Sequence, residues 1–120
     1  MFWFNADDVQ TLASLVDLHG EAKIVLRLDD GDLIAMSKIA GSWRILSTSV
    51  QANEWYHVLY TYDTTDGTAL YLDGRQVGTN SSVGSIPEEE DPGVNRVGSY
   101  FRNTEYFDGV IDDLQIYHWD

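Results

Sequence analysis

Hydrophobic alternation with a period of two is the feature that most constrains the fold of this chain. In "KIVLRLD", Ile24, Leu26 and Leu28 fall on one face of an extended segment, because side chains of a strand alternate between its two faces. An Asp-Gly pair in "DDGD" then supplies a tight turn, and "LIAMSKI" resumes the extended pattern. We therefore predict a β-hairpin over residues 23–39.

The longest predicted strand is "EWYHVLYTYD". Its alternation puts Tyr56 and Val58 on one side and Trp55 and His57 on the other. Two further turn signals, in "TTDGT" and "YLDG", separate this strand from two shorter extended runs. Together these signals predict three strands in meander order over residues 54–79.

The rest of the chain continues the same pattern. "NSSVGSIPEEEDPGVN" contains both prolines and four consecutive acidic residues, which predicts a surface loop, and "RVGSY" and a closing strand follow it. Many short strands with a turn about every ten residues, and no convincing helix, indicate an antiparallel sandwich or barrel. We expect a single all-β domain over residues 1–120.

Composition limits the partners that such a domain can have. Twenty Asp and Glu against seven Lys and Arg give a net charge of -13, which repels phosphate backbones and anionic lipids, so nucleic acid is not an expected partner. A cation or a neutral sugar fits better. Cysteine is absent, so disulfides and thiolate sites are excluded. The sequence shows neither an apolar run suited to membrane insertion nor a signal-peptide pattern, which predicts a soluble chain, either cytosolic or cut from a longer precursor.

Two stretches resemble laminin G-like domains of the concanavalin A-like lectin and glucanase superfamily. "NEWYHVLYTYDTTDGTALYLDGRQVG" is similar to that family's Trp-x-His-Val, Tyr-Asp and Leu-Tyr-x-Asp-Gly progression. "NRVGSYFRNTEYFDGVIDDLQIY" resembles its closing Phe-x-Gly-x-Ile-Asp-Asp-x-x-Ile-Tyr signature. "FWFNADD" and "TLASLVD" resemble its early strands, so the likeness covers nearly the whole chain. The resemblance implies an antiparallel two-sheet β-sandwich, a concanavalin A-like jelly roll with Greek-key connections.

The resemblance also implies partners and a location. Such domains mostly bind glycans or proteins and often carry calcium, so we expect a glycan or glycoprotein partner, a structural Ca²⁺, and a host protein that is extracellular, on a cell surface or in a virion. Relatives usually begin with a further N-terminal strand segment, which this chain lacks. Because a sandwich without that segment leaves backbone groups unpaired at a sheet edge, we expect a homo-oligomer that closes the exposed edge.

Asp112 is the predicted metal ligand. Alternation through "FDGVIDDLQIY" places it on the inward face of the closing strand, together with Val110, Leu114 and Ile116. An inward carboxylate needs hydrogen bonds or a cation. Two interpretations stay open: a structural latch, formed with backbone amides or with His57 or Arg96, or a calcium ligand assisted by backbone carbonyl oxygens.

Candidate sugar-binding residues lie in "GSYFRNTEYF", just before the closing strand. Aromatic rings that stack on sugars and planar polar groups that hydrogen-bond their hydroxyls are both present there, in Tyr100, Arg102, Asn103 and Tyr106. Trp43 follows a turn and is a further candidate if it lies nearby. Ordinary packing is the alternative role for each aromatic ring, and the family signature assigns Phe107 to the core.

Catalytic motifs are missing from the sequence. Sandwich glucanases carry Glu-x-Asp-x-x-Glu, which does not occur here, and there is no nucleophile elbow or Gly-rich phosphate loop. We therefore predict that the protein is not an enzyme but a non-catalytic carbohydrate-binding module. The rival hypothesis is a structural or adhesive module that contacts proteins and has no sugar site, and a third is a fragment of a catalytic domain whose active residues lie outside this chain.

Overall fold

The computed structural model describes residues 1–18, 24–84, 95–100 and 104–117. Within these ranges every regular element is a β-strand, as the alternation predicts. The ten strands are β1 (Phe2–Ala6), β2 (Ala13–Leu18), β3 (Ile24–Asp29), β4 (Asp32–Ile39), β5 (Ser42–Ser49), β6 (Trp55–Asp63), β7 (Gly67–Leu72), β8 (Arg75–Asn80), β9 (Arg96–Val97) and β10 (Gly109–Asp112).

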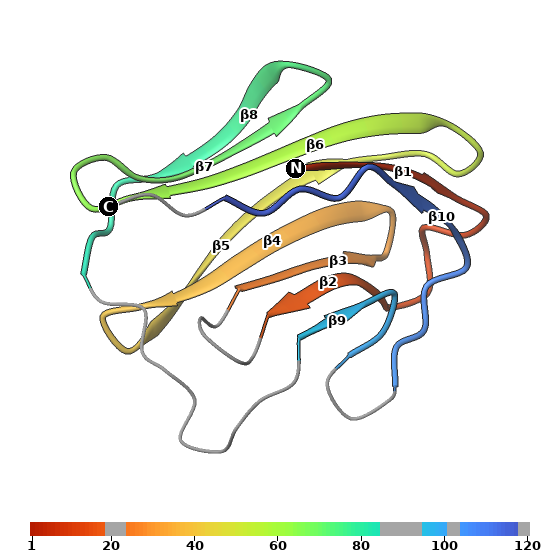
Figure 1. Cartoon of the computed structure of the whole chain (residues 1–120), viewed down its shortest axis with the longest axis horizontal. Coiled ribbons are helices and arrows are strands. Elements are labelled where there is room, and N and C mark those ends of the chain that lie inside the picture. The colour runs from red at the N-terminus through yellow and green to blue at the C-terminus, as the bar shows by residue number, and fades with distance from the viewer. Residues whose placement is uncertain (19–23, 85–94, 101–103, 118–120) are drawn as a thin grey trace.

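The strands form two five-stranded antiparallel sheets that face each other as layers of a sandwich (Figure 1). Sheet A has the order β10-β1-β6-β7-β8, and sheet B has the order β5-β4-β3-β2-β9. The chain starts in sheet A, builds four strands of sheet B, and returns to sheet A for β6–β8. It then adds β9 to sheet B beside β2 and ends with β10 beside β1. This arrangement confirms the predicted two-sheet sandwich.

Asp-Gly pairs form two of the hairpin turns. Asp30 and Gly31 between β3 and β4 have φ angles of 50° and 83°, and Asp73 and Gly74 between β7 and β8 have 52° and 80°. Two consecutive positive φ angles define the type I′ turn that matches the twist of paired strands. The predicted hairpin and the predicted meander are confirmed. Strand β5, which pairs with the whole length of β4, was not among the predicted strands.

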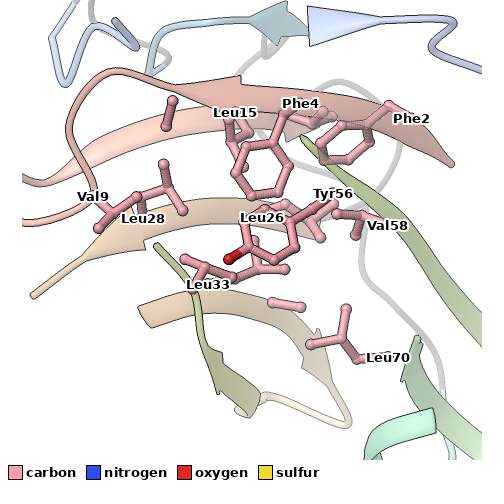
Figure 2. Close-up of a cluster of buried hydrophobic side chains, with 14 of the residues drawn as sticks. Phe2, Phe4, Val9, Leu15, Leu26, Leu28, Leu33, Tyr56, Val58 and Leu70 are labelled. Atoms are coloured by element: carbon pink, nitrogen blue, oxygen red, sulfur yellow. The ribbon is translucent and has the colours of Figure 1, made fainter. Parts of the chain in front are cut away.

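The core fills the space between the sheets (Figure 2). Sheet A contributes Phe2 and Phe4 from β1 and Val58 from β6, and all three are fully buried. Sheet B contributes Leu28 from β3 and Leu33 from β4, which are also fully buried. Burying such side chains stabilises the fold by about 1.5–3 kcal/mol each. The predicted separation of Tyr56 and Val58 from Trp55 and His57 is confirmed: Tyr56 and Val58 are buried in the core, so Trp55 and His57 face away from it.

One polar contact joins the two sheets through the core. The hydroxyl of Tyr60 in β6 hydrogen-bonds that of Ser37 in β4, and Ser37 is completely buried. Burial raises the pKa of the Tyr60 hydroxyl above its usual value. Burial therefore favours the neutral, protonated phenol, and the Ser37 hydrogen bond offsets only part of this effect on the pKa.

The orientation of Asp112 corrects the sequence prediction. Asp112 is exposed, whereas Ile111 packs against the core. Leu114 also packs against the core, although it lies three residues further along the chain. Asp113 explains the change, because its left-handed φ of 53° ends the extended run and shifts the alternation after it. The prediction was wrong because it continued a period of two through residue 113.

Candidate functional site

Four side chains form a row across the outer face of sheet A. Trp3 of β1 lies opposite Asp112 of β10 on one side and opposite His57 of β6 on the other. His57 in turn lies next to Asp73, just past the end of β7. Because residues at matched positions of paired strands point to the same face, the row runs Asp112, Trp3, His57, Asp73.

Two hydrogen bonds fix the end of this row formed by His57 and Asp73. The N–H of His57 donates to Oδ1 of Asp73 at 2.8 Å, and the N–H of Asp73 donates to the carbonyl oxygen of His57 at 2.8 Å. The carboxylate of Asp73 thus takes the place of a backbone acceptor beyond the end of β7. The left-handed Asp73-Gly74 turn makes this geometry possible.

Two exposed tryptophans lie at this surface, Trp3 within the row and Trp55 beside it. Trp3 is 41% exposed and Trp55 is 50% exposed, although both belong to regular strands. Trp55 lies opposite Asn5, two residues from Trp3, so the two indoles are diagonal neighbours on adjacent strands. The ring centroids of Trp3 and His57 are 5.0 Å apart, with the planes at 61°, an edge contact. A shallow open hollow is lined by Trp3, Trp55, His57, Asp73 and Gly74, which we call the tryptophan pocket.

A buried contact beneath the tryptophan pocket positions Trp55. Its neighbour Tyr56 points inward and stacks on Phe4, with centroids 5.4 Å apart. The Tyr56 hydroxyl accepts the N–H of Gln51 at 2.9 Å and donates to Glu54 at 3.0 Å, and burial raises its pKa above the usual value. These bonds hold the segment that leads into β6, so the direction of Trp55 is set by the core.

The tryptophan pocket offers the groups that a polar, ring-shaped ligand needs. The indole faces of Trp3 and Trp55 supply flat apolar surface, and each indole N–H is a hydrogen-bond donor. The second carboxylate oxygen of Asp73 accepts no hydrogen bond within the described residues. Flat apolar surface beside a few directed polar groups is the usual composition of a small-ligand site.

The structure does not gather the sugar-binding residues predicted from sequence. Trp43 lies on β5 of sheet B and is 39% exposed, beside the β4–β5 turn. That turn and the segment between β9 and β10 are at opposite ends of the molecule (Figure 1), so Trp43 is not near Tyr100 or Tyr106. Tyr100 is half-buried and pairs with Thr104, and Tyr106 is 67% exposed. Arg102 and Asn103 lie outside the described residues, and Phe107 packs against the core, as predicted.

Calcium binding by Asp112 stays a prediction. The inward orientation that suggested it is wrong, since Asp112 flanks the tryptophan pocket on the solvent side. In the part of the chain that the structure describes, no group of three or more His, Asp or Glu side chains is arranged to hold a metal ion.

Sequence reasoning missed the tryptophan pocket. The outward phase of Trp55 and His57 was readable from the alternation of their strand. The proximity of Trp3 was not, because it depends on β1 inserting between β6 and β10. The sequence signal that could have been used is the phase of Trp3 and Trp55, because each alternates with apolar neighbours in its strand and so points away from the face that those neighbours bury.

A second hollow opens between the two sheets. It has a volume of about 500 Å³ and apolar walls that include Phe2, Leu26 and Leu114. Leu18 and Ile24 on its wall flank residues 19–23, which lie outside the described part of the chain. We therefore assign no ligand to it. Among the described residues no helix has the length and hydropathy needed to cross a membrane.

Comparisons with known proteins agree with this fold. A family model described as the concanavalin A-like lectin/glucanases superfamily matches residues 1–119, while no curated protein sequence matches the chain. A crystal structure from Bacteroides ovatus ATCC 8483, described as that of a proposed carbohydrate-binding protein, is similar with a TM-score of 0.70 and 19% identity. The match covers 92% of this chain and 34% of that one, so this chain spans about a third of its neighbour's length.

Proposed function

Because the chain belongs to the concanavalin A-like lectin/glucanase superfamily, we propose that it is a non-catalytic carbohydrate-binding domain whose sugar site is the tryptophan pocket. The observation that carries the proposal is the pair of half-exposed indoles, Trp3 and Trp55, beside the polar groups of His57 and Asp73. Pyranose rings present apolar C–H faces that pack on indoles, and hydroxyls that pair with nearby donors and acceptors.

The similarity to the Bacteroides ovatus protein supports the proposal at the level of the fold. Fold alone does not determine function, so the site must carry it. We also propose that the host protein displays this domain outside the cell, on a cell surface or on a virion, where a glycan or glycoprotein is its partner.

The carboxylates around the tryptophan pocket favour binding over hydrolysis. A glycosidase needs two carboxyl groups about 5–9.5 Å apart on either side of the scissile bond. Asp112 and Asp73 are separated by three interstrand steps, which amounts to about 14 Å. This pair is too far apart to act as acid and nucleophile, or as acid and base.

A glycan array with matched tryptophan variants tests the proposal. Trp55→Ala should abolish or strongly weaken binding to the glycans that wild type captures, with little loss of stability, because the ring is half exposed. Trp43→Ala removes an indole of similar exposure from the other sheet and should leave binding unchanged. Loss of binding in Trp43→Ala but not in Trp55→Ala would move the site to sheet B. A wild-type protein that binds no glycan would favour the structural or adhesive alternative.

A further inference from the structure

We infer that the ligand of the tryptophan pocket is a short oligosaccharide that carries protonated amino groups. This inference rests on the proposed function and adds the chemical class of the sugar. It follows from the charges that surround the two indoles.

Carboxylates lie at both ends of the row across sheet A. Asp73 uses one oxygen to accept the N–H of His57, and its second oxygen is exposed beside the pocket. Asp112 is exposed on the strand next to Trp3. Neither carboxylate has a cationic partner among the described residues, so both are available to a ligand.

Within the described part of the chain, no Lys or Arg lines the tryptophan pocket. Arg75, the cation nearest in sequence to Asp73, pairs in register with Leu72, whose side chain packs against the core. It therefore belongs to the opposite face of sheet A. A uronate or sulfated sugar on the tryptophan pocket would meet two carboxylates, and no Lys or Arg in the lining of the pocket would offset them.

The geometry suits an elongated cationic ligand. Three interstrand steps put about 14 Å between the backbone positions that carry the two carboxylates, with Trp3 and His57 between them. A sugar chain lying across the strands can stack a ring on Trp3 while amines on flanking units approach Asp73 and Asp112. A protonated amine close to an indole face also gains a cation–π attraction. The net charge of -13 attracts such a ligand from solution at low ionic strength.

The expected preference is modest, because the charges are exposed. Exposed ion pairs and cation–π contacts together predict that an amine-bearing oligosaccharide binds about three- to tenfold more tightly than its N-acetylated counterpart. Acetylation keeps the sugar ring and its hydroxyls but removes the charge. Comparing the amine with its N-acetylated form therefore isolates the effect of the positive charge on the ligand.

Isothermal titration calorimetry tests the inference with the β-1,4-linked tetramers of glucosamine and N-acetylglucosamine and with the α-1,4-linked tetramer of galacturonic acid. The buffer should be mildly acidic and low in salt, so that amines are protonated and aspartates ionised. We expect the glucosamine tetramer to bind most tightly, the N-acetylglucosamine tetramer less tightly, and the galacturonic acid tetramer most weakly. The ratio between the first two should fall toward one in Asp73→Asn and Asp112→Asn, which keep the shape of each side chain.

Asp66→Asn serves as the control for charge. Asp66 is exposed in the β6–β7 turn, away from the row, so its loss should leave the affinity ratio unchanged. If Asp66→Asn lowers the ratio as much as Asp112→Asn does, the preference comes from net charge and the inference fails. Equal affinity of wild type for the two β-1,4 tetramers also overturns the inference, while leaving sugar binding intact. If no tetramer binds and the glycan array is also blank, the proposed function itself fails.

Discussion

Gly109 is the residue at which a single methyl group should disturb the sandwich most clearly. It begins β10, pairs with Ala6 of β1 and has a φ of 150°. A Cβ added there would lie 2.2 Å from the carbonyl oxygen of Asn5, 2.6 Å from Cζ of Phe107 and 2.9 Å from Cα of Ala6. Two of these atoms are backbone, so relief requires β10 to move away from β1.

The cost of Gly109→Ala follows from two contributions. Forcing alanine into a backbone conformation reserved for glycine costs about 1–3 kcal/mol, and overpacking adds about 1–3 kcal/mol. We expect the free energy of unfolding to fall by about 2–6 kcal/mol, out of the roughly 5–15 kcal/mol typical of a domain. With a urea m-value of about 1.5 kcal/mol/M, the unfolding midpoint should fall by more than about 1 M.

Gly41→Ala is the matched control for urea unfolding. Gly41 also has a positive φ, 82°, but an added Cβ meets no atom within 4 Å. Only backbone strain of about 1–2 kcal/mol applies there. If Gly109→Ala shifts the midpoint no more than Gly41→Ala, the close packing of β10 against β1 is wrong.

Three further outcomes follow from the structure. Tyr60→Phe removes the hydroxyl contact to Ser37 and should lower the free energy of unfolding, measured in urea, by about 1–2 kcal/mol. Because the folded pKa of Tyr60 is raised, the contribution of the Tyr60 hydroxyl to stability is full below pH about 10 and is lost as the pH rises through the folded pKa. The variant should therefore lose less stability at alkaline pH than wild type. Asp112→Ala should change the free energy of unfolding by less than about 0.5 kcal/mol, since the side chain is exposed. If Asp112 binds calcium, a chelator lowers the melting temperature of wild type but not of the variant. Equal responses of the two proteins to the chelator contradict a role of Asp112 in calcium binding. Light scattering should show an oligomer that strengthens with salt, because added ions screen a net charge of -13 on each chain; a monomer at every salt concentration refutes the predicted edge-to-edge pairing.

Local patterns of the sequence predict the fold because they act over a few residues. The Asp30-Gly31 and Asp73-Gly74 turns each fix their own hairpin through two positive φ angles, and the alternation in β6 separates its core face from its exposed face. The orientation of Asp112 was not predictable in this way. It depends on the left-handed conformation of Asp113, and nothing in the periodicity marks that residue as the end of the strand.

The tryptophan pocket depends on contacts between distant parts of the chain. Trp3 and Trp55 are brought together because β1 pairs with β6, and Asp112 joins them because β10 pairs with the other edge of β1. Strand order and register of this kind arise from the packing of the whole sandwich. A cluster of aromatic residues within one loop, such as Tyr100 and Tyr106, is easier to notice in sequence. Here the segment between β9 and β10 and the β4–β5 turn beside Trp43 lie at opposite ends of the molecule (Figure 1).

Indole N–H resonances measure the central claim most directly, because each tryptophan side chain gives its own signal in a ¹⁵N-correlated NMR spectrum. The protein should be titrated with the strongest ligand found on the glycan array. The signals of Trp3 and Trp55 should shift in proportion to saturation, while that of Trp43, on the other sheet, stays in place. Movement of the Trp43 signal with Trp3 and Trp55 unchanged would contradict a sugar site on the outer face of sheet A.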